Sequence, residues 1–399
     1  MQLGTAEAAP GELARGWLSV TDLPTGGAER LPVVVANGED DGPTLWLTGG
    51  VHGDEATGVA VAQDAMREDL PQRLAGAVVC VPVVSPAGLR RNARHTYYDD
   101  EDPNRHFPGV DGDSTGDGDS TGDGDSNGAS NYTGNDAGRP PNVQERIDER
   151  LYRAIVEGRV DADEDSDDTD SAVAADALID LHTAGVGSEP FAIRDRVLYG
   201  EQRDEADAKA LADDLAAIVE AFGFPILTEY PAEEYLDQQL QQSTAGAVLN
   251  KGGVPAFTAE LGAYSVVEED IRAGGVAGVY GVLTELDMLS AGDVPDGVGE
   301  PGDDVPDAPV DFPVRRYRGP HADTPGLVRH RVSAGDVVEA GEVVADVVSP
   351  TGAQRDTVAV DHDGYVIGRS EGLAAYEGDA VSSLAVRDED DLVVPREED

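Results

Sequence analysis

A histidine and a glutamate stand three residues apart directly after an apolar segment. His52 and Glu55 belong to the run TGGVHGDE at residues 48–55. An imidazole and a carboxylate at this spacing can bind one metal ion, and zinc accepts this ligand set. Gly53 and the two glycines before His52 let the backbone turn tightly after a strand. We therefore expect metal ligation; the alternative is a helix N-terminus that carries a surface pair.

A catalytic zinc site needs a third protein ligand and leaves one position for water. His182 ends the apolar run LIDLHT at residues 178–183. Asp180 or a backbone carbonyl can orient its imidazole. A strand-end histidine is often only a satisfied polar residue, but here a matching pair already exists. The three residues together indicate metal-assisted hydrolysis.

A carboxylate closes another apolar run. Glu260 lies in FTAELG at residues 257–262, where a carboxylate is costly to bury unless it is paired or functional. A zinc hydrolase needs a general base that takes a proton from the bound water and returns it to the leaving amine. We expect Glu260 to be that base; the alternative is a structural salt bridge.

Scarce positive charge is concentrated in one segment of this very acidic chain, which holds Arg90, Arg91, Arg94 and Arg105. An arginine fork can bind a carboxylate through two hydrogen bonds, and an arginine near zinc can stabilise an oxyanion. The alternative is pairing with the acidic residues 99–102, and for Arg90 and Arg91 we prefer it.

Length and charge limit the classes of function. The chain has 399 residues, enough for two or three domains, and a net charge of −52 from 28 basic and 80 acidic residues. Such a surface repels nucleic acid and anionic membranes in dilute buffer, so we expect neither as a partner. An acidic excess with almost no lysine resembles the proteins of salt-loving archaea. At molar salt the Debye length is about 3 Å, which screens the self-repulsion, so we give the acidity no role in catalysis.

Several patterns favour a soluble cytoplasmic protein. Cys80 is the single cysteine and lies in the apolar run VVCV at residues 78–81; it cannot form an internal disulfide, and we expect a buried thiol. No signal peptide is evident at the N-terminus. No apolar run approaches the roughly 20 residues that span a bilayer.

Strand-like and helix-like segments alternate between residues 31 and 290, which predicts an α/β fold with a mostly parallel, mixed sheet flanked by helices. The expected strands are 31–36, 44–48, 77–84, 177–181, 225–228 and 254–261. The expected helices are 56–70, 143–156, 204–222 and 266–290.

Two acidic insertions interrupt this α/β domain, which we assign to residues 1–290. The first, residues 110–139, repeats DGDSTG, and the second is residues 161–171. Gly, Asp and Ser without apolar side chains cannot form a core, so we expect disordered surface loops. Alternating aspartates can bind calcium, but no glutamate stands where an EF-hand loop has its bidentate ligand, so we do not predict a calcium site.

The pattern changes after a linker. Residues 291–310 are rich in Gly, Pro and Asp, as in a linker. Beyond them, short apolar segments are separated by turn residues roughly every 8–12 positions. This pattern predicts a small all-β domain over residues 311–399.

Together, the motifs resemble the succinylglutamate desuccinylase/aspartoacylase family of zinc amidohydrolases, which is related in fold to the zinc carboxypeptidases. The matching motifs are GVHGDE at 50–55, NRHFPG at 104–109, DLHT at 180–183 and ELG at 260–262. Their order and their strand-end placement agree with the family, and the resemblance covers roughly residues 30–390.

The resemblance implies one zinc ion per chain, with the ligands His52, Glu55 and His182. It implies that Glu260 is the general base and that Arg94 assists at the carbonyl oxygen. It also implies that Arg105, with Asn104, engages the substrate carboxylate. The departures are SPAG at residues 85–88, where members commonly show Asn-Pro, and Pro103 in place of a leucine; both concern substrate recognition.

The resemblance further implies that the C-terminal domain is a lipoyl-like barrel-sandwich that caps the site. Carrier domains of this shape need a lysine for lipoyl or biotin, and residues 311–399 contain none, which excludes a swinging-arm role. Tyr317 and Tyr365 are candidates for an aromatic side chain that this domain offers to the substrate.

We expect a zinc-dependent hydrolase that removes an N-acyl group, acetyl or succinyl, from an amino acid or a related small amine. Its partner is then a small N-acylated amino acid. One alternative is a metallocarboxypeptidase that acts on peptide C-termini, and another is a non-catalytic zinc-binding protein of the same fold. Glu260 and Arg105 together argue against the last, because a structural site needs neither. The sequence holds no signal for the oligomeric state.

Overall fold

The computed structural model describes residues 1–96, 98, 100–108, 141–159, 173–303 and 305–396. The two insertions expected at residues 110–139 and 161–171 lie outside these ranges.

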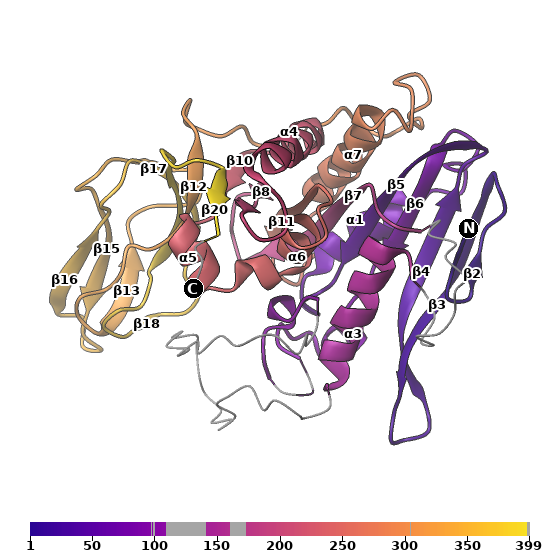
Figure 1. Ribbon diagram of the computed structural model, residues 1–399. Helices are drawn as coiled ribbons and strands as arrows, with labels where there is room; N and C mark the ends of the chain where they lie inside the picture. The colour runs from indigo at the N-terminus through magenta and orange to yellow at the C-terminus, as the bar shows by residue number, and fades with distance from the viewer. Residues whose placement is uncertain (97, 99, 109–140, 160–172, 304, 397–399) are drawn as a thin grey trace.

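Within the described residues, twelve strands form one mixed sheet that runs through the molecule (Figure 1). In spatial order they are β14 (Val337–Val338), β17 (Gly364–Arg369), β19 (Ser382–Arg387), β12 (Val314–Arg318), β10 (Ile226–Thr228), β8 (Phe191–Arg194), β11 (Ala256–Ala263), β7 (Ala177–Ala184), β5 (Asp40–Gly49), β6 (Ala75–Val81), β4 (Ala28–Asn37) and β3 (Glu12–Asp22). An α/β fold with a large mixed sheet, as the sequence predicts, is confirmed.

Parallel pairing is found at the centre of this sheet. Strands β6, β5, β7 and β11 are mutually parallel, and a second parallel group joins β8, β10 and β12. The remaining pairs are antiparallel, because β3 and β4 form a hairpin and the C-terminal strands return along their neighbours. The sheet is therefore less parallel at its margins than the alternating pattern indicated.

Helices cover both faces of the central strands. The helices are α1 (Ala56–Ala65), α2 (Pro86–Arg91), α3 (Val143–Tyr152), α4 (Glu205–Phe222), α5 (Ala232–Asp237), α6 (Thr244–Asn250) and α7 (Glu269–Glu285). Helices α1, α4 and α7 pack on one face, where the rings of Phe222 and Phe257 meet with centroids 5.4 Å apart. Helices α3 and α6 lie on the other face (Figure 1). None of the described helices is long and apolar enough to cross a bilayer.

The ends of α4 show why the sequence forms a helix there. The side chain of Asp204 accepts hydrogen bonds from the backbone N–H groups of Ala206 and Asp207, each at 2.9 Å. Gly223 ends the helix in a left-handed conformation, which glycine adopts without steric cost. The expected helix over residues 204–222 is therefore found with nearly the same limits.

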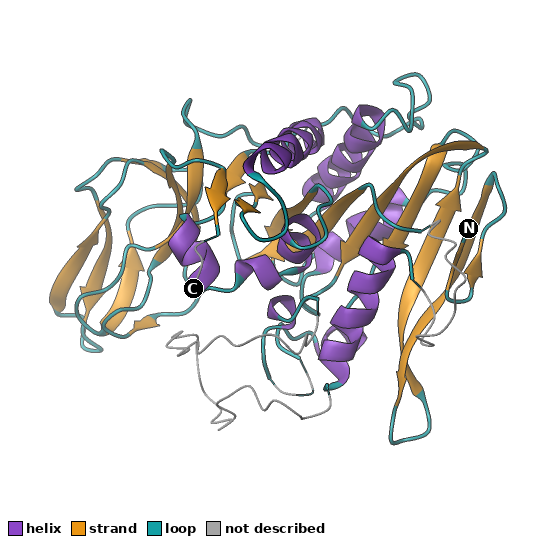
Figure 2. Ribbon diagram, in the orientation of Figure 1, coloured by secondary structure: helices purple, strands orange, loops and turns teal. Residues whose placement is uncertain are grey.

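Residues 314–395 form strands and loops, as Figure 2 shows, while the helices gather around the central sheet. Besides the strands named above, they contain β13 (Gly326–His330), β15 (Val343–Val348), β16 (Gln354–Ala359), β18 (Ala374–Ala375) and β20 (Val393–Pro395). These strands agree with the β structure expected for the C-terminal residues, whereas its barrel-sandwich description and the domain limits stay predictions.

The C-terminal strands are joined to the α/β part by strand pairing. β12 pairs in parallel with β10, and β20 pairs in parallel with β9 (Val197–Tyr199). At the other end of the chain, β1 (Gln2–Leu3) and β2 (Ala6–Glu7) form a small hairpin beside β3. Strands that precede the linker expected at residues 291–310 are thus hydrogen-bonded to strands that follow it.

Candidate metal centre and active site

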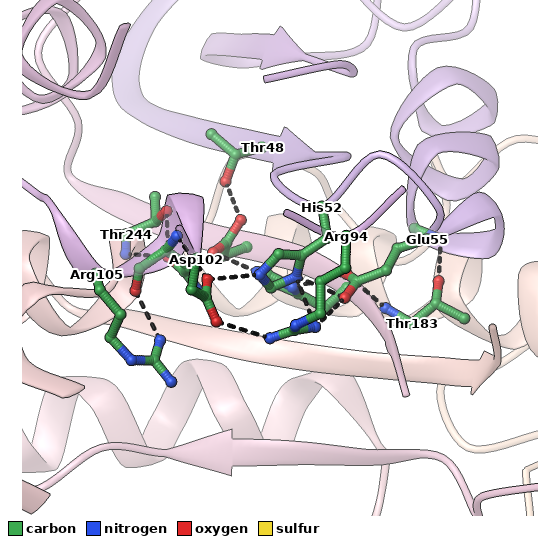
Figure 3. Close-up of polar contacts among 12 residues, drawn as sticks. Thr48, His52, Glu55, Arg94, Asp102, Arg105, Thr183 and Thr244 are labelled. Carbon is green, nitrogen blue, oxygen red and sulfur yellow. Dashed lines mark hydrogen bonds and ion pairs between the residues drawn. The ribbon is translucent and has the colours of Figure 1, made fainter. Parts of the chain in front are cut away.

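The three expected metal ligands converge at the carboxyl ends of β5 and β7. His52 and Glu55 lie in the loop between β5 and α1, and His182 lies in β7. All three are buried, and one ligand atom of each lies within 4.8 Å of the others. Figure 3 shows His52 and Glu55 side by side at this point. The residues that the sequence pattern singled out are thus brought together by the fold.

Both imidazoles turn the same nitrogen toward the carboxylate. His52 Nδ1 lies 2.6 Å from Glu55 Oε1, and His182 Nδ1 lies 2.8 Å from Glu55 Oε2. The two rings meet edge to face with centroids 5.1 Å apart. Two nitrogens and a carboxylate oxygen therefore face one position, and this donor set suits zinc.

The outer nitrogens of the two histidines are held by aspartates. His52 Nε2 lies 3.0 Å from Asp102 Oδ1, and His182 Nε2 lies 2.8 Å from Asp180 Oδ2. Thr48 Oγ1 donates a 2.6 Å hydrogen bond to the other oxygen of Asp180. A carboxylate on the outer nitrogen favours a proton there and leaves Nδ1 free to bind a metal. The residues present therefore fit a zinc ion.

Electrostatics keep the Glu55 carboxylate ionised. Burial alone would raise its pKa, but the charges of His52 and His182 outweigh burial, and the pKa is lowered far below its ordinary value. The backbone N–H of Thr183 also donates to Glu55 Oε2 at 3.1 Å. Metal ligands must be deprotonated; Glu55 meets this condition, whereas each charged imidazole would have to release its Nδ1 proton when a metal binds.

Arg94 lies directly beside the ligands, as Figure 3 shows. Its Nη1 is 3.2 Å from Glu55 Oε1, and its Nη2 is 3.1 Å from Asp102 Oδ2. About half of its side chain is exposed. Asp102 thus holds both Arg94 and His52. No pattern in the sequence had marked Asp102 as a functional residue.

Glu260 lies on the same face of the sheet as His182. The two residues are directly paired between β11 and β7, and paired residues project their side chains to one face. Glu260 Oε2 is buried and has no hydrogen-bond partner among the described residues. Burial and the nearby charge of Glu55 raise the pKa of Glu260. Within the described chain Glu260 forms no ion pair, so the alternative of a structural salt bridge finds no support.

Asn104 connects the arginine-bearing turn to a helix. Its side-chain oxygen accepts hydrogen bonds from the backbone N–H and the hydroxyl of Thr244, at 2.8 and 3.0 Å, at the start of α6. Arg105 donates from Nη1 to the Asn104 carbonyl at 2.7 Å. In the view of Figure 3, Asp102 lies between Arg105 and Glu55. Asn104 therefore anchors the turn, and Arg105 is set apart from the metal ligands.

A second charged group, missed in the sequence, is supplied partly by the C-terminal strands. Parallel pairing places Arg316 of β12 beside Glu229, with a 2.5 Å ion pair. The guanidinium also lies over the ring of Tyr230, 5.2 Å from its centroid. Arg316 and Arg94 partly offset the rise in the pKa of Glu260. Positive charge from the C-terminal strands thus reaches the candidate base.

The two aromatic candidates of the C-terminal strands, Tyr317 and Tyr365, pack against neighbouring side chains. Tyr365 is buried in an apolar cluster that also contains Phe191 and Ile367. Tyr317 packs edge to face on His362, with ring centroids 5.0 Å apart. A role of either tyrosine toward a substrate stays a prediction.

Comparison with known proteins supports the resemblance drawn from the motifs. A family model described as the succinylglutamate desuccinylase/aspartoacylase catalytic domain matches residues 41–122. The chain is 26% identical over 369 residues to the N-alpha-acetyl-L-2,4-diaminobutyric acid deacetylase of Halomonas elongata. That match covers 90% of this chain and 86% of the deacetylase.

Solved structures share the fold along nearly the whole chain. A succinylglutamate desuccinylase/aspartoacylase from Rhodobacter sphaeroides matches with a TM-score of 0.65 and 21% identity, over 94% of both chains. The product-bound ectoine utilization protein EutE from Ruegeria pomeroyi matches with a TM-score of 0.67 and 19% identity, over 96% of this chain and 98% of that one. At these identities the likeness establishes the fold.

Proposed function

We propose that this protein is a zinc-dependent amidohydrolase of the succinylglutamate desuccinylase/aspartoacylase family, which removes an N-acyl group from an amino acid or a related small amine. The observation that carries the proposal is the buried group of His52, Glu55 and His182, with both outer imidazole nitrogens held by aspartates. The deacetylase from Halomonas elongata, which resembles this chain over most of its length, supports the reaction class.

His52, Glu55 and His182 would hold the metal, which when bound would supply Lewis acidity and lower the pKa of a water on it towards about 7. Glu260 takes a proton from the attacking water and returns it to the leaving nitrogen. Its buried, unpartnered Oε2 is free for this task. Because its pKa is raised, the carboxylate is a stronger base than an exposed glutamate.

Two arginines act on the substrate in this proposal. Arg94 stabilises the negative charge that develops on the carbonyl oxygen, and Asp102 holds its guanidinium in place. Arg105 binds the substrate carboxylate through its guanidinium fork. Asn104 fixes the position of Arg105 through its bonds to Thr244. Small N-acylated amino acids, with acetylated diamino acids first among them, are the substrates to test.

A hydrolysis screen of the zinc-loaded protein at molar KCl tests this function. The panel contains N-acetyl and N-succinyl forms of aspartate, glutamate, arginine and ornithine, N-acetylated diamino acids, and short peptides. The matched control is Glu260→Gln, which keeps the size of the side chain and removes the base. We expect acid release from an acyl-amino acid, and a decrease in kcat of about 10²–10⁴-fold in the variant with zinc still bound.

Other outcomes of the screen select other functions. Cleavage of peptides alone would support a metallocarboxypeptidase with the same metal site. Stoichiometric zinc binding without hydrolysis of any compound would favour a non-catalytic zinc-binding protein. Hydrolysis that persists undiminished in Glu260→Gln would reject Glu260 as the base.

A further inference from the structure

The turn after β11 contains a tyrosine in a backbone conformation that side chains rarely adopt. Tyr264 has φ of 58°, in the left-handed region. Glycine enters this region freely, whereas other residues are strained there. The side chain is 38% exposed, so burial of the ring does not account for the conformation. Residues held under such strain cluster at functional sites.

The backbone of Tyr264 joins the two segments that carry the metal ligands. Its N–H donates a 2.7 Å hydrogen bond to the carbonyl of Ala184, and its carbonyl accepts from the N–H of Ala56 at 3.4 Å. Ala184 lies two residues after His182, and Ala56 directly follows Glu55. One residue therefore bridges the end of β7 and the start of α1.

The same turn begins just after Glu260. β11 pairs with β7 at Glu260–His182 and again at Ala263–Ala184, with a register shift between these pairs. β11 thus has one more residue than β7 between them, which is the arrangement of a β-bulge. Gly262, within this stretch, has φ of 76°. A bulge bends the strand and changes the direction of nearby side chains, so the turn also affects the candidate base.

Side chains strengthen the contact between this turn and α1. The hydroxyl of Thr57 donates to the carbonyl of Val266 at 3.2 Å and accepts from the N–H of Glu268 at 3.3 Å. The phenol of Tyr264 lies beside the carboxylate of Asp54, which directly precedes Glu55. The turn is therefore attached to the ligand loop on both sides of Glu55.

We propose that Tyr264 is a positioning residue: its left-handed backbone sets the separation of Glu55 and His182 and thereby the geometry of the metal centre. This inference rests on the proposed function, because it requires that these residues bind a metal ion. The inference gives Tyr264 a role in the metal centre that depends on its backbone and needs no contact with the atoms that would bind the metal.

A series of substitutions at one position tests the role of the backbone. Tyr264→Gly and Tyr264→Asn retain access to the left-handed region, Tyr264→Ala has less access, and the β-branched Tyr264→Val has least. Tyr376→Val is the matched control, since Tyr376 is an exposed tyrosine with an ordinary backbone conformation. Thermal unfolding of each metal-free variant shows whether it is folded.

Two measurements report on the metal centre itself. Zinc affinity is measured by competition with a chromophoric chelator, and the visible absorption spectrum of the cobalt-substituted protein reports ligand geometry. We expect zinc affinity to fall in the order Gly and Asn, then Ala, then Val, with a loss of about tenfold or more for Val. The cobalt spectrum should change in the same order, and Tyr376→Val should match wild type in both measurements.

The outcomes separate this inference from the proposed function. Folded Ala and Val variants with the zinc affinity and cobalt spectrum of wild type would overturn the role of Tyr264 and leave the metal centre standing. If Val fails to fold, the comparison of Ala with Gly decides. A wild-type protein that binds neither zinc nor cobalt would overturn the proposed metal centre and this inference with it.

Discussion

Two aspartates give direction to the imidazoles of the candidate metal centre. Asp102 reaches His52 from a loop and Asp180 reaches His182 from two residues away on the same strand. Burial alone would raise the pKa of Asp102, but His52 and the neighbouring arginines outweigh burial and hold the pKa well below its ordinary value. A carboxylate partner on each outer nitrogen makes the facing nitrogen a stronger metal ligand.

Replacing Asp180 should weaken metal binding without unfolding the protein. Asp180→Asn keeps the size of a fully buried side chain and removes its charge. We expect zinc affinity to fall by about 10–100-fold, measured by chelator competition. Thr48→Ser is the control, because its hydroxyl can still donate to residue 180, and it should bind zinc like wild type. Equal affinities in both variants would contradict the role of Asp180.

The single cysteine should be unreactive in the folded protein. Burial raises the pKa of the Cys80 thiol above its ordinary value of 9.0, and Sγ lies 3.3 Å from the carbonyl of Ala62. Because the folded pKa is the higher one, the contribution of Cys80 to stability is complete below pH 9 and decreases as the pH rises above it. We expect a thiol reagent at pH 9 to label the protein only after unfolding in urea. Rapid labelling of the native protein would contradict this prediction.

At the scale of elements, the close approach of α1 to β7 brings Glu55 to the metal centre. A Cβ atom added at Gly58 would lie 2.3 Å from the carbonyl oxygen of Leu181. The N–H of Gly58 also donates to Thr183 Oγ1 at 3.1 Å. A helix with any side chain at this position would have to move away from the strand, and the ligand loop would move with it.

Gly58→Ala should therefore destabilise the protein, although alanine favours helices more than glycine does. We expect the free energy of unfolding in urea to fall by about 1–3 kcal/mol, the usual cost of overpacking. Gln63→Ala, at an exposed position of the same helix, should change it little. A Gly58→Ala variant as stable as wild type would show that α1 can shift without cost.

Elements with a strong local pattern could be predicted from the sequence. The buried strand β6 is a continuous apolar run, and α4 carries an aspartate cap and a terminal glycine. β3 was not expected, because most of its residues are partly or fully exposed and its pairing with β4 stabilises it. The strands β8 and β9 are too short for any periodicity to emerge.

In the candidate site, too, residues within a local sequence pattern could be predicted, whereas residues that depend on contacts distant in the sequence could not. Strand-end positions marked His182 and Glu260, and the turn after β5 marked His52 and Glu55. Pairing of Asp102 with an arginine was among the expected alternatives, but its contact with His52 could not be predicted, because Asp102 lies in a loop fifty residues further along the chain. The ion pair of Glu229 and Arg316 depends on the pairing of β10 with β12, which no local pattern encodes.

For the whole molecule, charge is the dominant property. A net charge of −52 on one chain produces self-repulsion that opposes the compact state. Even if each of the 28 basic residues were paired with a carboxylate, 52 of the 80 acidic residues would keep an uncompensated charge. Most of the repulsion must therefore be screened by ions in the solvent.

Stability should accordingly rise with salt. Raising KCl from about 0.1 M to about 1 M shortens the Debye length from about 10 Å to about 3 Å. We expect the Tm from thermal unfolding to increase over this range. An uncharged osmolyte of equal osmolality is the control, because it does not screen charge and should have a smaller effect. A Tm that is unchanged or lower in KCl would contradict the prediction.

The pairing of β9 with β20 also determines when the fold can be completed during synthesis. Residues 197–199 leave the ribosome long before residues 393–395, their partner strand. Arg196 is fully buried in the finished fold and donates a 3.0 Å hydrogen bond to the carbonyl of Asp391. This bond cannot form until Asp391 has been synthesised. A ribosome paused within the C-terminal strands would therefore hold a chain in which the edge of β9 has no partner strand and Arg196 has no carbonyl of Asp391 to bind.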